Sequence, residues 1–322
     1  MYFGILEYLR ENEYISGEMI AQELTISRVA VWKQIQRLKK LGYVIISDQN
    51  LGYCLTSRPD ILLPQELQRG LSTHYIGKEI FYFPEAKSTN LIAKEKIISK
   101  KEVIKEGTVI IAEKQMAGKG RLGRQWFSPR GGIWLTIILY PPLSPTYISR
   151  ITLMTAVAVV RAIKEYTSIT LQIKWPNDLI NKEKKIGGIL TEMNAELDRI
   201  NWVIVGLGLN VNIDLQDFPP ELKRKSNSLK EILGRDVSRV RLGQCLLREF
   251  EKYYERLKRE EFISILEEWK TYASTLDKDV KLDIGGKVIQ GRAIDVGSNG
   301  ALILRKENGE LMEIISGTLI KL

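Results

Sequence analysis

The sequence has few of the residues that metal sites and disulfide frameworks require. Its 322 residues include two cysteines, Cys54 and Cys245, and a single histidine, His74. The cysteines lie far apart and form no CxxC pair, which excludes a disulfide scaffold and a zinc-finger or zinc-ribbon site and favours a reducing cytoplasm. Sites that need two or three imidazoles are excluded too, and His74 is expected to be an ordinary surface or linker residue. An enzyme with this composition must work mainly by electrostatics and positioning.

Long apolar runs and a secretory leader are also lacking. No uninterrupted apolar run approaches the roughly 18 residues needed to span a bilayer. The N-terminal stretch has no basic leader and carries Glu7 inside its apolar part, so it does not resemble a signal peptide. With 44% hydrophobic and 27% charged residues, the composition is that of a soluble globular protein of two or three domains. We therefore expect a cytoplasmic protein without a membrane partner.

Acidic residues are missing from one short segment of this basic chain, whose formal net charge is +9. Acids dominate residues 1–26, whereas residues 27–41 contain basic charges only. Ser16 and Ser27 are each predicted to cap a helix, with a stop at Gly42. Residues 44–55 then read as a β-hairpin. The pattern of helix, short break, helix and hairpin predicts a winged helix-turn-helix domain.

The second of these helices is predicted to have an apolar and a basic face. Val31, Ile35 and Leu38 share one stripe, and basic side chains fall on the opposite side. A basic helix face of this kind is typical of a recognition helix in the major groove of DNA, although it is also found as a solvated surface. The candidate DNA-binding residues are Ser27, Arg28, Lys33, Gln36, Arg37 and Lys40.

The remaining chain is predicted to hold two further domains after a linker. Residues 1–58 form the winged helix, residues 59–77 a proline-containing linker, residues 78–274 a mixed α/β domain and residues 275–322 a small all-β module. In the mixed domain, strands are predicted at 79–83, 108–113, 132–140, 170–174, 179–181, 185–193 and 201–209, and helices at 88–100, 147–166, 227–233, 239–258 and 261–272.

One segment of the mixed domain, residues 115–126, alternates glycines with cations. Glycines let backbone N–H groups approach an anion closely, and lysine and arginine supply charge and donors for phosphate or carboxylate. The segment is not a Walker loop, because GxxxxGK[ST] is absent. A mobile basic loop that binds nothing in particular has the same pattern. Its charged and aromatic members are Lys119, Arg121, Arg124 and Trp126.

Two further segments carry polar residues between strands. KWPND at 174–178 is followed by KIGGIL at 185–190, so Asp178 and Lys185 flank a hairpin turn. That pair could equally be a surface ion pair worth about 0–1 kcal/mol. GLGLN at 206–210 is a strand without side chains at two positions, which suits the close approach of another group but also a β-bulge.

Taken together, these segments resemble the biotin–protein ligase family. The motifs that carry the resemblance are Ser88-Thr89-Asn90, GKGRLGRQW at 118–126, KWPND, KIGGIL and GLGLN, in that order. The resemblance covers essentially the whole chain and is to the bifunctional type, a ligase and a biotin operon repressor in one. It implies an α+β multidomain fold with an N-terminal winged helix-turn-helix, a central biotin/lipoate ligase-like domain and a C-terminal SH3-like β-barrel. The glycine-rich, histidine-containing motif of the related lipoate-attaching family is not found.

The resemblance implies an ATP-dependent ligase with two steps. Biotin is activated as biotinyl-5′-AMP with release of diphosphate, and the acyl group then passes to a lysine of a biotin carboxyl carrier protein, an acetyl-CoA carboxylase subunit. ATP and biotin are the substrates, Mg²⁺ accompanies them, and no protein metal site is expected. Biotinyl-AMP would also promote a homodimer that binds operator DNA. Two alternatives stay open: a winged helix with no operator function, and a biotin-sensing regulator without ligase activity.

The resemblance also assigns roles to residues. Lys185, Arg121 and Asp178 are the implied catalytic residues. For biotin the implied residues are Ser88, Thr89, Asn90, Gln115, Lys119, Gly120, Arg121 and Lys185. For ATP and the adenylate they are Gly118, Arg121, Arg124, Trp126, Asp178 and Asn210. Lys119 departs from the fully arginine form of the loop. The lysine keeps the positive charge at that position but cannot donate two parallel hydrogen bonds as an arginine does.

Overall fold

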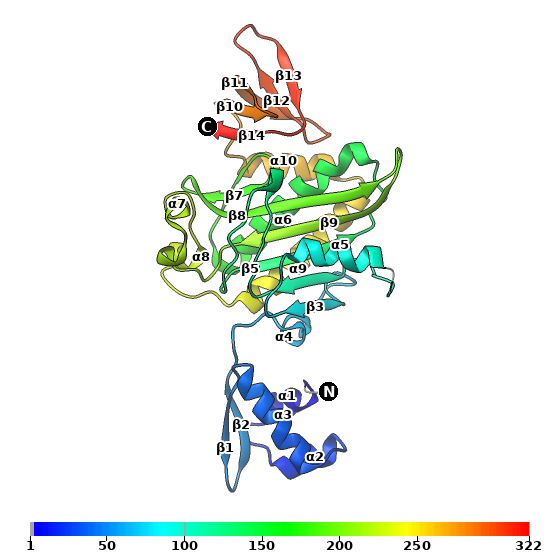
Figure 1. The fold of residues 1–322 in the computed structure, drawn as a ribbon, viewed down its shortest axis with the longest axis vertical. Helices are drawn as coiled ribbons and strands as arrows, with labels where there is room; N and C mark the ends of the chain where they lie inside the picture. The colour runs from blue at the N-terminus through cyan, green and yellow to red at the C-terminus, as the bar shows by residue number, and fades with distance from the viewer. Residues whose placement is uncertain (1–2, 100, 322) are drawn as a thin grey trace. The chain divides into compact units, whose positions relative to one another are not determined.

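Two units make up the chain in the computed structural model, which describes residues 3–99 and 101–321. The first unit is Met1–Ile61 and the second is Leu62–Leu322. Figure 1 shows the elements of both units in chain order. The first holds the helices α1 (Phe3–Glu11), α2 (Gly17–Glu23) and α3 (Arg28–Lys40), followed by the antiparallel hairpin β1 (Val44–Asp48) and β2 (Gly52–Ser57).

Local signals in the sequence account for the helix ends of the first unit. The Ser16 hydroxyl accepts a hydrogen bond from the backbone N–H of Met19 at 3.1 Å, and Ser27 caps α3 in the same way. Gly42 follows α3 with φ of +94°, a conformation that favours glycine. Helix α1 was not predicted. The winged helix-turn-helix architecture is confirmed.

A seven-stranded mixed sheet forms the centre of the second unit. Its strand order is β3-β4-β5-β9-β8-β7-β6, and the pairing is antiparallel except for the parallel pair of β3 and β4. The strands are β3 (Ile80–Phe83), β4 (Val109–Ala112), β5 (Ile133–Leu139), β6 (Gln172–Lys174), β7 (Asp178–Asn181), β8 (Lys184–Ala195) and β9 (Ile200–Leu209).

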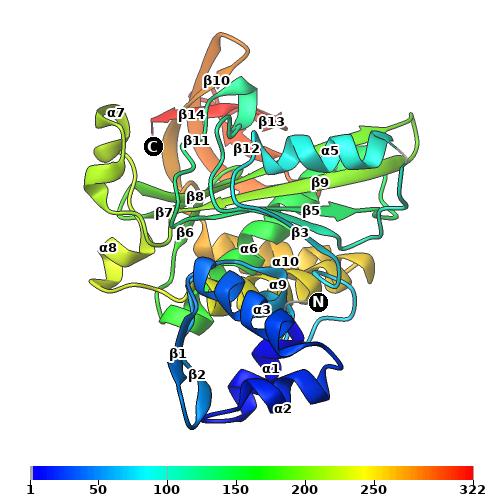
Figure 2. The same cartoon turned by 60° about the horizontal axis from the view of Figure 1, so that its bottom comes forward.

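Helices cover both faces of this sheet. Figure 2 shows α5 (Thr89–Ser99) on one side, and α6 (Ile148–Thr167), α9 (Arg239–Lys258) and α10 (Phe262–Tyr272) on the other. The shorter helices are α4 (Pro64–Gln68), α7 (Pro220–Lys223) and α8 (Leu229–Leu233). Every strand and helix predicted for residues 78–274 has a counterpart, whereas α4 and α7 were not predicted.

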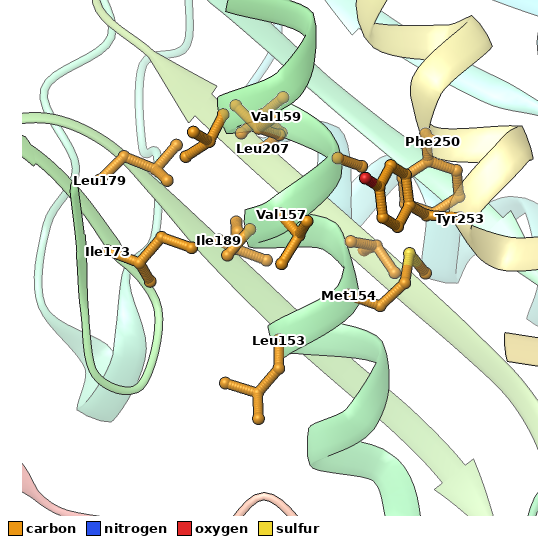
Figure 3. Close-up of a cluster of buried hydrophobic side chains, with 14 of the residues drawn as sticks. Leu153, Met154, Val157, Val159, Ile173, Leu179, Ile189, Leu207, Phe250 and Tyr253 are labelled. Atoms are coloured by element: carbon orange, nitrogen blue, oxygen red, sulfur yellow. The ribbon is translucent and has the colours of Figure 1, made fainter. Parts of the chain in front are cut away.

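Helix α6 forms the centre of the core. Together with residues just before it, it is the one stretch of the described chain, Pro145–Thr167, that is long and apolar enough by length and composition to cross a membrane. Its most apolar window has a mean hydropathy of 1.3 and is 61% buried inside the unit. Figure 3 shows Val157 and Met154 of this helix, with Ile189 and Leu179 of the sheet to one side and the α9 residues Phe250 and Tyr253 to the other. The apolar character of α6 thus reflects its packing on all sides.

Strand alternation decides which face of the sheet is left for a binding site. On β9, Val203 and Val205 point into the core with α6, whereas Ile204 points to the α5 side. The next positions on that α5 side are Gly206 and Gly208. The α5 face of the sheet therefore has no side chains at these two glycines, which leaves space for a ligand.

Residues 62–77, which were expected to belong to a linker, are mostly packed into the second unit. Leu62, Leu67 and Ile76 are buried in its core. The backbone N–H of Leu62 donates to the Glu113 carboxylate at 2.8 Å. Burial of these apolar side chains outweighs the turn signal of the prolines, so the division between the units falls after Ile61.

The C-terminal residues form a five-stranded antiparallel sheet with the order β13-β12-β11-β10-β14. Its strands are β10 (Lys278–Ile284), β11 (Lys287–Val296), β12 (Leu302–Arg305), β13 (Leu311–Ile314) and β14 (Thr318–Lys321). The strands β13 and β14 stand at its two edges. The all-β prediction is therefore confirmed. Among the described residues, no pairing between β13 and β14 closes the sheet into a barrel.

Candidate active site

A pocket of about 260 Å³ opens where the first turn of α5, loop 115–127 and the glycines of β8 and β9 meet. The turn at 174–178 and residues 317–319 of the C-terminal sheet complete its wall. Segments that are distant in the sequence therefore form one cavity. All five motifs singled out in the sequence contribute to it.

Two glycines of β9 make the pocket possible. A Cβ at Gly206 would overlap the Asn90 side-chain amide, and a Cβ at Gly208 would lie 2.5 Å from Trp126 Nε1. Any larger residue would therefore displace a side chain of the pocket. The GLGLN segment is a regular part of the ladder between β5 and β9, not a bulge.

Backbone hydrogen bonds within the loop that carries the cations close it into a turn. The N–H of Gly120 donates to the carbonyl of Arg124 at 2.7 Å, and the N–H of Trp126 donates to the carbonyl of Gly118 at 2.8 Å. A short 3₁₀ turn, Arg121–Gly123, lies between them, with Leu122 in the left-handed region. These bonds close the segment into a turn that carries its cations at the pocket.

Arg121 joins this loop to the C-terminal sheet. Its guanidinium donates to Asn177 Oδ1 at 3.2 Å, Ser316 Oγ at 3.0 Å and the Gly317 carbonyl at 3.2 Å. Arg124 donates to Thr318 Oγ1 at 3.2 Å. Burial lowers the pKa of Arg121; the nearby Asp178 opposes this change. Among the described residues the hydrogen-bond partners of Arg121 are all neutral, so none of them is an anion that matches its charge.

Lys185 and Asp178 form an ion pair in the lining of the same pocket. Lys185 Nζ is 2.6 Å from Asp178 Oδ1, and both side chains are only partly exposed. The same ammonium lies 4.9 Å from the centre of the Trp126 ring. The pair therefore lines the pocket next to an aromatic face.

One end of the pocket is neutral and polar. Ser88, Thr89 and Asn90 are buried at the start of α5. Gln115 faces them: its Oε1 accepts from the Thr89 backbone N–H at 2.8 Å, and its Nε2 donates to Ser128 Oγ at 2.9 Å. Because a backbone N–H can only donate, these contacts fix the orientation of the Gln115 amide.

Positive charge dominates the rest of the pocket. The described lining residues include the cations Lys119, Arg121, Arg124, Lys174 and Lys185 and a single carboxylate, Asp178. Such a set suits an anionic ligand. Among the described residues, no group of three or more histidine, cysteine or acidic side chains could hold a metal ion by itself.

The structure brings together nearly all of the predicted site residues of the second unit. Every predicted biotin and nucleotide residue except Gly118 lines the pocket. Gly118 packs instead against the backbone of Trp126 and the Ser128 hydroxyl. The sequence analysis missed several lining residues, including Lys174, Asn177, Phe218, Ser226 and Thr318. Asn177 lies inside the KWPND motif, which could have indicated it.

The predicted DNA-binding residues lie along α3 in the first unit. Arg28, Lys33, Arg37 and Lys40 are exposed, and Gln36 is partly exposed. Ser27 is also exposed, but its hydroxyl is engaged in capping the helix. Two exposed apolar residues of the same helix were not predicted, Val29 at 62% and Trp32 at 54% exposure.

Family models match three parts of the chain. The Biotin/lipoate A/B protein ligase family matches residues 82–210, an HTH domain matches residues 3–54, and the Biotin protein ligase C terminal domain matches residues 275–322. The pocket is built largely from the first of these parts, and the third supplies Ser316 and Gly317, two of the three hydrogen-bond partners of Arg121.

Curated relatives match almost the full length. The chain is 38% identical over 299 residues to the bifunctional ligase/repressor BirA of Bacillus subtilis, which covers 92% of this chain and 91% of the relative. It is 27% identical to the protein of the same name from Escherichia coli, over 94% and 92% of the two chains. Among solved structures, the biotin protein ligase of Aquifex aeolicus in complex with biotin and ATP has a TM-score of 0.65 at 30% identity, covering 75% of this chain and 97% of that one.

Proposed function

The chain belongs to the biotin protein ligase family, in its bifunctional ligase/repressor form, and on that premise we propose how its residues divide the work. The protein is an ATP-dependent biotin ligase with a DNA-binding unit. The observation that carries the proposal is the pocket itself, which joins a neutral polar end to a cationic one.

Adenylate formation needs little proton transfer. The carboxylate of biotin attacks the α-phosphorus of ATP, a new acyl–phosphate bond forms, and pyrophosphate leaves with the electron pair of the broken P–O bond. A carboxylate is already ionised near pH 7, so no general base is required. Charge accumulates on the phosphate oxygens and the leaving group, which favours catalysis by cations. The composition of this pocket suits such a reaction.

The neutral end holds the ureido head of biotin. This head has N–H donors and a carbonyl acceptor, which hydroxyls and side-chain amides can match. Ser88, Thr89, Asn90 and Gln115 are the residues proposed for it, and all four are at that end of the pocket. Lys119 and Gly120 then line the acyl chain and its carboxylate.

The cationic end stabilises the reacting groups. Arg121 binds the phosphate of the adenylate with its planar guanidinium, exchanging neutral partners for a charged one. Lys185 contacts the attacking carboxylate or the α-phosphate. Asp178, 2.6 Å from Lys185, orients that ammonium and faces the lysine that enters in the second step. In that step the lysine amine attacks the acyl carbon and AMP leaves.

The adenine lies near Trp126 and Asn210, with Arg124 close to the phosphates. Trp126 Nε1 is buried and has no hydrogen-bond partner among the described residues, so a nucleotide acceptor could satisfy it. Asn210 is held by a bond from its Nδ2 to the Asn227 carbonyl at 3.0 Å. Gly118 contributes to the shape of the loop.

Mg²⁺ enters with the nucleotide. This ion commonly binds through one or two carboxylates together with substrate phosphates, and it neutralises phosphate charge. The single lining carboxylate, Asp178, fits that mode and not a preformed protein cage. Asp178 is therefore the residue that would hold the ion together with the substrate phosphates.

The first unit acts as the DNA-binding part of the repressor. Its exposed cations on α3 suit the phosphates of an operator, and biotinyl-AMP promotes a homodimer that presents two such helices to two half-sites. The carrier that receives biotin is the biotin carboxyl carrier subunit of acetyl-CoA carboxylase, a cytoplasmic protein. The ligase is accordingly proposed to work in the cytoplasm.

Transfer of labelled biotin tests the ligase. The full chain, ATP, Mg²⁺ and labelled biotin are incubated with a biotin carboxyl carrier domain, and a second carrier domain with its acceptor lysine replaced by arginine is the control. We expect label on the first domain only. A chain that binds biotin without transferring it would be a biotin-sensing regulator. DNA selection with and without biotin and ATP tests the repressor, since a unit without operator function would select no sequence.

A further inference from the structure

An ion pair stands directly behind the neutral end of the pocket. Lys94 Nζ lies 2.6 Å from Glu192 Oε1, and each side chain is about one-third exposed. Neither residue is among those that line the pocket. The other carboxylate oxygen, Glu192 Oε2, accepts a hydrogen bond from Asn90 Nδ2 at 2.7 Å. The pair therefore reaches the pocket through Asn90.

These contacts fix which way the Asn90 amide faces. A carboxylate only accepts hydrogen bonds, so the NH₂ end of the amide must face Glu192. A longer bond at 3.5 Å joins the same nitrogen to the Leu190 carbonyl, which also only accepts. The amide oxygen must then face Thr136, whose hydroxyl donates to it at 2.6 Å. The bare Gly206 leaves the space that this oxygen occupies.

The orientation passes from Asn90 to Thr89. A hydroxyl has one hydrogen, and Thr136 uses it on Asn90, although its oxygen lies 2.8 Å from Thr89 Oγ1. Thr89 therefore receives no hydrogen from Thr136. It donates its own to Thr136 or to Gln115 Oε1, which lies 3.1 Å away. Its free lone pairs remain available to accept from a ligand N–H.

We propose that Glu192, held by Lys94, is a positioning residue for biotin: it fixes the amide of Asn90 and thereby leaves the Thr89 hydroxyl oxygen as an acceptor for a ureido N–H. The proposal rests on the proposed function, because it takes biotin as the occupant of this end. If the amide turned over, Thr136 would donate to Thr89 and occupy one of those lone pairs.

Lys94 supports Glu192 from the same helix as Asn90. It lies one turn along α5, four residues after Asn90. Two donors on this helix, Asn90 Nδ2 and Lys94 Nζ, therefore contact the Glu192 carboxylate on strand β8. Removing Lys94 leaves Glu192 free to accept from Asn90. The effect of Lys94→Met on biotin binding is therefore expected to be smaller than that of Glu192→Gln.

Glu192→Gln in the full chain tests the proposal. The substitution keeps the size but allows either end of the new amide to face Asn90. We expect the Kd for biotin alone and the KM for biotin to rise about 10-fold, the loss of one hydrogen bond to a charged group. The KM for ATP and kcat for pyrophosphate release should stay within about twofold of wild type. Glu102→Gln is the matched control, since Lys96 and Glu102 form an ion pair that begins on the same helix, and neither is among the described residues that line the pocket.

A double substitution separates positioning from a general loss of structure. Asn90→Asp alone should weaken biotin binding strongly, because two carboxylates then face each other. In Asn90→Asp combined with Glu192→Gln, the new amide at position 192 can donate to the new carboxylate at position 90. The other oxygen of that carboxylate still accepts from the Thr136 hydroxyl. The double variant should therefore bind biotin more tightly than Asn90→Asp by about 5-fold or more.

Either of two results would overturn the proposal. One is wild-type biotin affinity in Glu192→Gln. The other is a rise of both KM values together with a lower Tm and no rescue in the double variant, which indicates loosening of the fold. A wild-type chain that fails to bind biotin would instead contradict the proposed function.

Discussion

In the pocket, Arg121 makes three hydrogen bonds and is partly buried, whereas on helix α3 the cations Lys33 and Lys40 are exposed to solvent. Both regions are positive and both are proposed to bind phosphate. The difference lies in how the charge is held: hydrogen bonds hold Arg121 and an ion pair holds Lys185, while the α3 cations extend from an exposed helix face. Charges that are held and partly buried are screened little by salt, and exposed ones strongly.

Raising the salt concentration should separate the two regions most clearly. Between about 50 and 200 mM salt, operator affinity is expected to fall by about 10³-fold, because displaced counterions return to the DNA. Biotin affinity, which depends on neutral hydrogen bonds and on cations held in the pocket, should change by less than about twofold. DNA binding and biotin binding are measured on the same preparation. An equal fall in both would mean that the comparison is wrong.

Lys185→Ala should have the next largest effect, and only in the pocket. Removing a positioned cation from the reacting carboxylate is expected to slow adenylate formation by about 100-fold. The rate of pyrophosphate release measures it. Lys184→Ala at the neighbouring position of β8, outside the pocket lining, is the control. An unchanged rate in Lys185→Ala would remove this residue from the mechanism.

Arg121→Gly should shorten the lifetime of bound biotinyl-AMP by about 10-fold or more, since a charged hydrogen bond to phosphate is lost. The dissociation rate of the labelled adenylate is the measurement. Arg130→Gly serves as comparison, because that arginine is exposed and pairs with Glu85 at 4.0 Å. If Arg121→Gly released the adenylate at the same rate as Arg130→Gly and wild type, Arg121 would have no role in holding the adenylate. Its role would then be limited to its contacts with the C-terminal sheet.

Lys33→Gln should produce the smallest change, and only in the first unit. Losing one phosphate contact is expected to lower the slope of log affinity against log salt by about one for each half-site, while ligase activity stays at the wild-type level. A titration of operator DNA at several salt concentrations measures the slope. A wild-type slope would place Lys33 outside the DNA contact.

The helices and strands of both regions could be predicted from the sequence, whereas most contacts of the pocket could not. Ser16, Ser27 and Gly42 mark helix ends through local chemistry, and the structure has them at those ends. Runs of apolar and β-branched residues likewise indicated the strands of the central sheet. By contrast, α1 has no capping serine, and the linker prediction failed because proline signals a turn without reporting the burial of Leu62 and Leu67.

Contacts between distant segments could not be predicted in this way. Arg121 and Ser316 are separated by 195 residues in sequence yet lie within 3.0 Å. No periodicity or motif connects them, because only the packed C-terminal sheet brings them together. The same holds for Glu192 and Asn90, which are 102 residues apart. The exposure of Trp32 was also missed, since an apolar residue in a helix is expected to be buried.

The most direct test of the central claim, that one pocket joins biotin to the nucleotide, is mass spectrometry of the protein after incubation with ATP, Mg²⁺ and biotin. The account predicts one biotinyl-AMP bound to each chain and one pyrophosphate released for it. Protein that retains biotin and unreacted ATP, with no pyrophosphate formed, would contradict the account.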